Sequence, residues 1–317
     1  MTSQDLRLPQ VKTLWRVDAT RKLFLLSLIT IASTISGAGQ SAREMSLDVT
    51  VADDKGIVAT GLKREWFTIS ENKSPLQITG FETSDEPASV AVIVDLSNSI
   101  SVESKKAFIQ AVSQLIKSAN AHNDYLIVGF NREISVIADW SHDQSQIEKQ
   151  LAVASQVVKE QTALYDACSF ALTKLASRTL SRRALVILSD GQDTVSKLTF
   201  GKLRDQIRAS STIVYAVGAI PRDGANTLGL EARGILDELS SVSGGNGYYP
   251  TSTREILAIS DQIALELRHL YRITFRLPST NPDNKWHTIK VKLTLPDDPG
   301  RKFERLSMRS RPGYYDR

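Results

Sequence analysis

The feature that most constrains the fold is a run of apolar, mostly β-branched residues, Val90–Val94, which ends abruptly in Asp95. Every residue of this run is apolar, rather than every second one, so a strand formed by it must be buried on both faces. Similar runs occur at residues 124–130, 183–190 and 212–218, and amphipathic segments separate them. This alternation predicts a doubly wound α/β fold, with a mostly parallel sheet and helices on both faces.

The segments between the predicted strands carry apolar residues at helical spacing. Phe108, Val112 and Leu115, for example, fall on one face of a helix predicted over residues 102–119. Further helices are predicted near residues 143–155, 164–177, 200–209, 229–242 and 253–270, with a glycine-rich turn before the last of them. Asn131-Arg132 reads as a tight connection between strands 124–130 and 133–139, which predicts one antiparallel strand at an edge of the sheet.

The two ends of the chain have a different pattern. Residues 46–82 and 272–309 alternate apolar and polar side chains as half-buried strands do, with Pro and Gly between them. Each flank has only about forty residues, which seldom bury a stable core alone. We therefore predict that segments 43–88 and 271–317 pair into one small β-sandwich beside an α/β domain of residues 89–270.

An apolar run near the N-terminus predicts export. Arg21 and Lys22 precede the run Leu23–Ile35, and small residues follow it, which is the order of a signal peptide. The run is shorter than the roughly 20 residues that span a bilayer. Cleavage is expected after Ala38 or, as second choice, Ala42, so that residues 1–42 are a leader and the protein is periplasmic or secreted. An uncleaved segment would instead anchor the protein to the membrane.

The charge pattern argues against a nucleic-acid partner. The net charge of +4 comes from Lys and Arg scattered along the chain, apart from a basic cluster over residues 301–311. A nucleic-acid surface would more often be a basic stripe with interleaved aromatic residues. Cys168, as the only cysteine, permits no intrachain disulfide and is expected to be a small buried apolar side chain.

Oxygen-bearing side chains follow two of the predicted strands. Asp95 ends one strand and is followed by Ser97 and Ser99, while Asp190 ends another strand and Thr162 precedes a helix. Ligands of open parallel sheets bind beyond the carboxyl ends of the strands, so these residues are expected to meet at one edge. They offer only oxygen ligands, which predicts a hard divalent cation, Mg²⁺ first and Mn²⁺ or Ca²⁺ next.

This constellation resembles the metal-ion-dependent adhesion site (MIDAS) of the von Willebrand factor type A (vWA) domain. The stretch DLSNS matches the Asp-x-Ser-x-Ser motif of that family, Thr162 in QTALYDA matches its single threonine, and Asp190 in ILSDGQD matches its second aspartate. The resemblance covers roughly residues 89–270, and the flanks are similar to those of a bacterial exported group of vWA-related proteins.

The resemblance implies a role for each matching residue. Ser97, Ser99 and Thr162 would touch the metal through their hydroxyls, while Asp95 and Asp190 would hold it mainly through bound water. Family members use such an ion to grip a Glu or Asp of a protein ligand. Lys159, Glu160 and Gln161 stand where the family often has glycines, which leaves open whether Thr162 coordinates in the resting state.

Each of these residues also has a purely local alternative. Ser97 or Ser99 could be helix N-caps, Asp190 could belong to a turn, and Thr162 could cap its own helix. An enzyme is a further alternative, because an acid at the end of the first strand also marks haloacid-dehalogenase-type phosphotransferases. Their second acid would stand at Ser97, however, and no Lys or Arg is indicated at the site.

Other enzyme classes lack their motifs. A dinucleotide site would require glycines after the first strand, but the stretch DLSNSIS contains none. The four histidines show no pairing in the sequence that would support a hydrolase. We therefore predict a non-enzymatic, exported module that binds an acidic residue of a protein or peptide partner through a divalent cation. The alternatives are a structural envelope protein with a vestigial metal site and, third, a metal-dependent phosphotransferase. Membrane contact is expected only if the signal segment is uncleaved.

Overall fold

The structure is a computed structural model of the chain. It describes residues 43–317 with the exception of 155–159, 220–226, 280, 297–302 and 304. The predicted leader with its two cleavage positions, and Lys159, therefore lie outside the described residues. None of the described helices combines the length and the apolar character that a membrane crossing needs.

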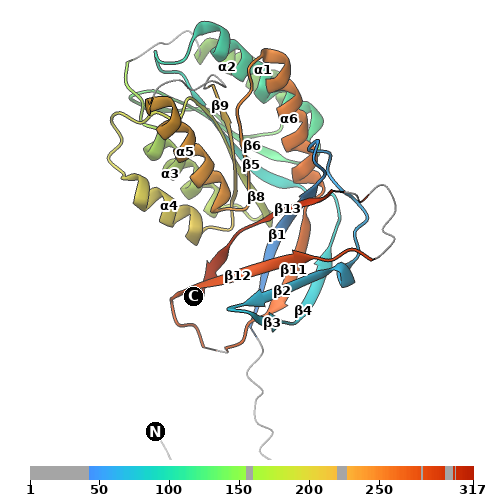
Figure 1. The fold of residues 1–317 in the computed structure, drawn as a ribbon. Coiled ribbons are helices and arrows are strands. Elements are labelled where there is room, and N and C mark those ends of the chain that lie inside the picture. Colours follow the sequence, from blue (N-terminus) through green and yellow to red (C-terminus); the bar gives the residue numbers. More distant parts are fainter. Residues whose placement is uncertain (1–42, 155–159, 220–226, 280, 297–302, 304) are drawn as a thin grey trace, which may run out of the picture. The chain divides into compact units, whose positions relative to one another are not determined.

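A six-stranded sheet forms the centre of the α/β domain (Figure 1). Its strands, in their order across the sheet, are β10 (Gly247–Tyr248), β9 (Ile213–Gly218), β8 (Arg182–Ser189), β5 (Ala88–Asp95), β6 (Asp124–Phe130) and β7 (Ile134–Ser141). All neighbours pair in parallel except β6 and β7. This confirms the predicted mostly parallel sheet with one antiparallel edge strand. The predicted glycine-rich turn also contains a strand, because Gly247 and Tyr248 pair with β9.

Helices cover both faces of this sheet (Figure 1). The helices on the face of Val90, Val92 and Val94 are α1 (Val102–Ser118), α2 (Gln144–Ala154) and α6 (Thr253–Arg268). Those on the face of Ala91 and Ile93 are α3 (Leu164–Ala176), α4 (Phe200–Ala209) and α5 (Thr227–Ser241). Successive residues of a strand point to opposite faces, so β5 meets apolar side chains on both sides, which explains its continuous apolar run.

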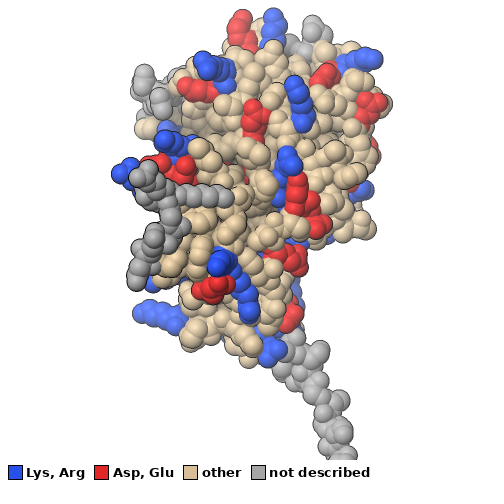
Figure 2. Space-filling model, turned by 90° about the vertical axis from the view of Figure 1, so that its right-hand side faces the viewer, with Lys and Arg blue, Asp and Glu red and all other residues tan. Residues whose placement is uncertain are grey.

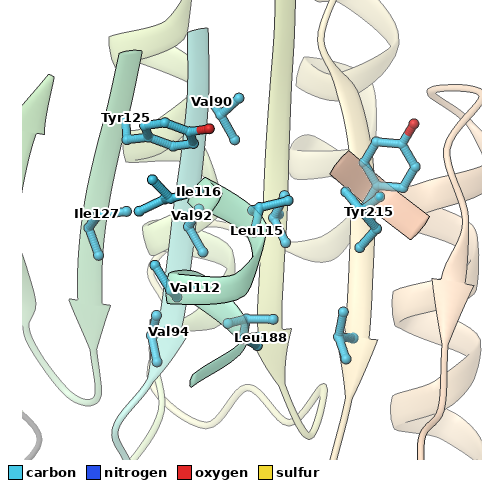
Figure 3. Close-up of a cluster of buried hydrophobic side chains, with 14 of the residues drawn as sticks. Val90, Val92, Val94, Val112, Leu115, Ile116, Tyr125, Ile127, Leu188 and Tyr215 are labelled. Carbon is cyan, nitrogen blue, oxygen red and sulfur yellow. The ribbon is translucent and has the colours of Figure 1, made fainter. Parts of the chain in front are cut away.

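The packing of α1 on β5 holds the end of this strand in place. Val112, Leu115 and Ile116 of α1 lie over the valines of β5 (Figure 3). Burying an aliphatic side chain contributes about 1.5–3 kcal/mol, so the row of contacts makes β5 one of the most firmly held elements. Cys168 is fully buried in the cluster on the opposite face, as expected, and burial raises the pKa of its thiol.

Two four-stranded sheets stack beside the α/β domain (Figure 1). The strands of one, in order, are β13 (Ser307–Ser310), β1 (Glu44–Ala52), β11 (Tyr271–Arg276) and β4 (Ile78–Glu82). The strands of the other are β14 (Gly313–Tyr315), β12 (Trp286–Leu293), β2 (Phe67–Glu71) and β3 (Ser74–Leu76), and a short 3₁₀ turn (Arg64–Trp66) precedes β2. Both sheets combine strands from the two ends of the chain and enclose one apolar core. The predicted β-sandwich of the two flanks is thus confirmed, while its exact domain boundaries stay a prediction.

Charged side chains of both signs are interspersed over the face of the molecule shown in Figure 2. Two described residues of the basic cluster also have acidic partners. Arg309 lies 2.7 Å from the carboxylate of Glu266, and Arg305 lies 3.4 Å from that of Asp54. At least part of this cluster is therefore used within the protein itself.

The pair of Glu266 and Arg309 joins α6 of the α/β domain to β13 of the sandwich. Glu266 is completely buried, and its other carboxylate oxygen accepts a hydrogen bond of 2.9 Å from the hydroxyl of Tyr248. A carboxylate buried in this way is costly unless a positive charge accompanies it. Arg309 supplies that charge, so the pair couples the sandwich to the sheet domain.

We expect Arg309→Met to lower the free energy of unfolding by about 3 kcal/mol, because Glu266 would remain buried without its partner. The double variant Glu266→Gln with Arg309→Met should recover most of the loss. Arg305→Met is the matched control, since its ion pair is solvent-exposed, and should change stability by less than about 0.5 kcal/mol. Urea denaturation measures all three variants. Equal losses for Arg309→Met and Arg305→Met would contradict the coupling role.

Candidate metal centre

The carboxylate of Asp95 is fully buried at the end of β5. The backbone N–H and the hydroxyl of Ser97 donate to its Oδ1 atom at 3.0 and 2.6 Å. The hydroxyl of Ser189, the last residue of the neighbouring strand β8, donates to its Oδ2 atom at 2.7 Å. Both oxygens are therefore held by hydrogen bonds, and two adjacent strands of the sheet determine where the carboxylate lies.

The serines after Asp95 continue this group of oxygens toward the surface. The Oγ atoms of Ser97 and Ser99 are 2.9 Å apart, and Ser97 is buried whereas Ser99 is exposed. The N-cap of α1 is Ser101, whose hydroxyl accepts from the backbone N–H of Ser104. The alternative that Ser97 or Ser99 caps this helix is therefore wrong.

Asp190 lies close to the same carboxylate. It follows β8 directly, is mostly buried, and its negative charge contributes to raising the pKa of Asp95. Its Oδ1 atom also accepts from the backbone N–H of Gln192 at 3.0 Å, so the turn predicted as its local role exists as well. Gly191 makes this turn at φ +82°, where an added Cβ would lie 2.6 Å from the carbonyl oxygen of Ala232.

Thr162 lies in the loop before α3, beside the loop that follows Asp190. Its backbone N–H donates to the hydroxyl of Thr194, and its carbonyl oxygen accepts from the backbone N–H of Thr194, both at 2.8 Å. The N-cap of α3 is Ala163, so Thr162 does not cap that helix. None of the contacts described joins the Thr162 hydroxyl to Asp95, Ser97, Ser99 or Asp190, and its part in the site stays a prediction.

The backbone before Thr162 has a conformation that suits glycine. Gln161 has φ +71°, in the left-handed region that costs a residue with a side chain about 1–2 kcal/mol. The side chains of Glu160 and Gln161 are both exposed. Gln161 therefore takes a backbone conformation that a glycine would adopt without strain.

The electrostatics at Asp95 favour a cation. Burial raises the pKa of this carboxyl from 3.8 to about 6, against the hydrogen bonds from Ser97 and Ser189, which lower it, and the charge of Asp190 raises it further. At neutral pH the carboxylate is thus ionised in a place that disfavours its charge. A donor set of carboxylates and hydroxyls fits a hard divalent cation, which would relieve this cost.

Sequence reasoning missed a positive charge near the site. Lys105 is buried near the start of α1; burial lowers the pKa of its ammonium group, and the charge of Asp95 raises it. No Lys or Arg was indicated at the site by the sequence, whereas Lys105 lies near enough to Asp95 for the charge of Asp95 to affect its pKa. The signal was present, because Lys105 precedes Phe108 by three residues and Val112 by seven and so falls on the apolar face of the helix.

Comparison with known proteins found one family profile that matches part of the chain. Residues 90–192 match the family profile described as von Willebrand factor type A domain. No match was found among curated proteins.

Several solved structures are similar to the chain. The protein BatB from Bacteroides thetaiotaomicron is 17% identical, with 56% of this chain and 98% of that chain covered and a TM-score of 0.45. The vWF domain of the type V pili tip protein Mfa5 from Porphyromonas gingivalis is 11% identical, with 58% and 95% covered and a TM-score of 0.47. Proximal thread matrix protein 1 from the mussel byssus, with a zinc-occupied MIDAS motif, is 13% identical, with 61% and 48% covered and a TM-score of 0.49.

We expect Asp95→Asn to raise the free energy of unfolding of the metal-free protein at pH 7.5 by about 2–3 kcal/mol, because the amide carries no charge into the interior. The pKa of Asp95 is about 6 in the folded protein and 3.8 as reference. The wild type should therefore match the variant below pH 4 and lose stability relative to it as the pH rises through 6. Urea denaturation in EDTA at several pH values tests this. A difference that is the same at every pH would contradict a charge effect.

Proposed function

We propose that this chain, of which residues 90–192 match the profile of a von Willebrand factor type A domain, is a non-enzymatic binding module that grips an acidic residue of a protein or peptide partner through a divalent cation. The proposed metal ligands are Asp95, Ser97, Ser99, Thr162 and Asp190. Mg²⁺ is the proposed ion, with Mn²⁺ or Ca²⁺ as alternatives. We also propose that the protein is exported and acts in the periplasm or outside the cell, anchored to the membrane if its N-terminal segment is uncleaved.

One observation carries this proposal. A continuous group of oxygen atoms leads from the buried carboxylate of Asp95 through the hydroxyl of Ser97 to the exposed hydroxyl of Ser99. The hydroxyls nearest the surface are neutral, and neutral ligands leave a bound cation with most of its charge. An open position on such a cation favours a carboxylate from outside the protein, which is the chemistry of an adhesion-type contact.

Lys105 favours the second candidate, a structural envelope protein with a vestigial metal site. The charge of Asp95 raises the pKa of its ammonium group, so the two groups attract each other within the protein. The phosphotransferase alternative gains less from this lysine, because the position two residues after Asp95 is still a serine whose hydroxyl donates to Asp95. The two leading candidates differ in whether the site binds a metal ion at all.

We expect the purified full chain to bind about one equivalent of Mg²⁺ or Mn²⁺ in a calorimetric titration, and Asp95→Ala and Ser99→Ala to abolish or strongly weaken that binding. Ser101→Ala is the matched control, because it removes a hydroxyl two residues further on that caps α1 instead. It should cost about 1 kcal/mol of stability and leave metal binding unchanged. The absence of binding heat in the wild type would remove the metal-dependent function.

The same proposal predicts that EDTA abolishes partner capture without unfolding the protein, since the apolar cores do not contain the site. Pull-downs from the envelope of the producing cell, with and without EDTA and with Asp95→Ala as bait, measure the first effect. Far-UV circular dichroism in EDTA measures the second. Unfolding on metal removal would contradict this arrangement.

Lys105 provides a separate test, because its positive charge opposes a cation beside Asp95. We expect Lys105→Met to raise the affinity for Mg²⁺ about fivefold, which corresponds to about 1 kcal/mol of removed repulsion. Lys106→Met, at the exposed neighbouring position, is the control and should change the affinity little. Equal affinities for both variants would show that Lys105 does not influence the ion.

A further inference from the structure

His287 of the β-sandwich lies among acidic side chains from distant parts of the chain. Its Nδ1 atom is 2.5 Å from Oε1 of Glu71, and its Nε2 atom is 3.0 Å from Oδ1 of Asp283. Asp283, His287 and Asp316 each offer a ligand atom, and these three atoms lie within 4.8 Å of one another. The sequence does not indicate this cluster, because Glu71 and Asp316 lie far from His287 along the chain.

Glu71 holds the imidazole ring of His287 through its Nδ1 atom, on the side away from Asp283. It is a buried residue of β2, and its second oxygen accepts a hydrogen bond of 2.8 Å from the hydroxyl of Tyr314. The ring of Tyr314 also stacks on the imidazole, with 5.2 Å between the ring centroids. Histidines that bind metals usually donate their other ring N–H to such a carboxylate. With Nδ1 directed to Glu71, Nε2 is the atom left for a ligand.

The backbone brings the two aspartates to the same place. The N–H of Asp316 donates to the carbonyl oxygen of Lys285 at 3.0 Å, and the N–H of Asn284 donates to the carbonyl oxygen of Asp316 at 2.7 Å. These bonds fasten the C-terminal segment to the turn that contains Asp283. The cluster is therefore organised by the fold, with contributions from β12, the turn before it and the segment after β14.

Asp316 is a buried carboxylate at this point, with 3% of its surface exposed. One of its oxygens, Oδ1, lies 2.5 Å from Nη2 of Arg43 and makes no hydrogen bond within the described part of the chain. Arg43 balances part of the charge there, while Asp283 is more than a third exposed and can adjust its position. The cluster thus combines one buried, one half-buried and one exposed ligand.

We propose that Asp283, His287 and Asp316 form a second metal site, which binds a divalent transition ion such as Zn²⁺. One imidazole and two carboxylates suit Zn²⁺, Co²⁺ or Fe²⁺, whereas an all-oxygen set suits Mg²⁺. Three protein ligands leave a fourth position to water, as in zinc sites with an open position. Ligand atoms that lie 3.0–4.8 Å apart need shifts of only about 1 Å to reach zinc bond lengths of about 2 Å. The site does not depend on the proposed function of Asp95.

The test uses the full chain with Asp95→Ala, so that the oxygen site cannot contribute. Calorimetric titration should show about one equivalent of Zn²⁺ bound, and Co²⁺ should give a visible absorption band. Adding Asp283→Asn should weaken Zn²⁺ binding by at least about tenfold, and adding Glu71→Gln should weaken it about tenfold through the imidazole. Adding His122→Ala, an exposed histidine of the α/β domain, is the matched control and should leave binding unchanged.

Asp283→Asn is the decisive variant because it alters an exposed turn residue and should leave the fold intact, which urea denaturation verifies. Undiminished Zn²⁺ binding in that variant would overturn the proposal, as would the absence of Zn²⁺ binding in the Asp95→Ala protein. Failure of Mg²⁺ binding in the wild type concerns the other site alone, so the two proposals fail separately.

Discussion

The burial of an ionisable carboxylate at the end of the central strand is the constraint on which the candidate site depends. β5 is buried along its whole length, so Asp95 emerges in the interior at the edge of the sheet. Hydrogen bonds from Ser97 and Ser189 lower the pKa of its carboxyl, but burial outweighs them. The charge therefore has an energetic cost that a cation can offset. The strand is rigid because helices pack on both of its faces, and this rigidity keeps the oxygens of the candidate site in place.

The β-sandwich depends on both ends of the chain and on its contact with the sheet domain. β1 pairs with β11 and β13, and β12 pairs with β2, so neither flank completes a sheet by itself. The buried pair of Glu266 and Arg309 then ties the sandwich to α6. Arg182 adds a second tie, because it donates to the carbonyl oxygens of Ser84 and Leu270, between which the sheet domain is inserted. These two contacts hold the sandwich and the sheet domain together.

Two residues outside the motif influence the surroundings of the candidate site. Gln161 holds a left-handed backbone beside Thr162, which stores strain in the loop. Lys105 brings a positive charge to Asp95, which opposes a cation. If the proposed cation binds here, the charge of Lys105 would weaken its binding relative to a site without this lysine. A weaker site would exchange its ion more readily, so partner contacts would respond to the surrounding metal concentration.

The sequence by itself determined the fold class and predicted the residues of the candidate site, because those signals are local. Continuous apolar runs identify strands buried on both faces, and Asp95 and Asp190 are recognised by their place at the ends of such strands. The tertiary structure alone decided where Lys105 lies relative to Asp95, and it showed that Gln161 takes the conformation of a glycine. It also brought Glu71, Asp283, His287 and Asp316 together from three distant segments. The physical reason is that strand and helix periodicity act over a few residues, whereas contacts between flanks depend on how whole sheets pack.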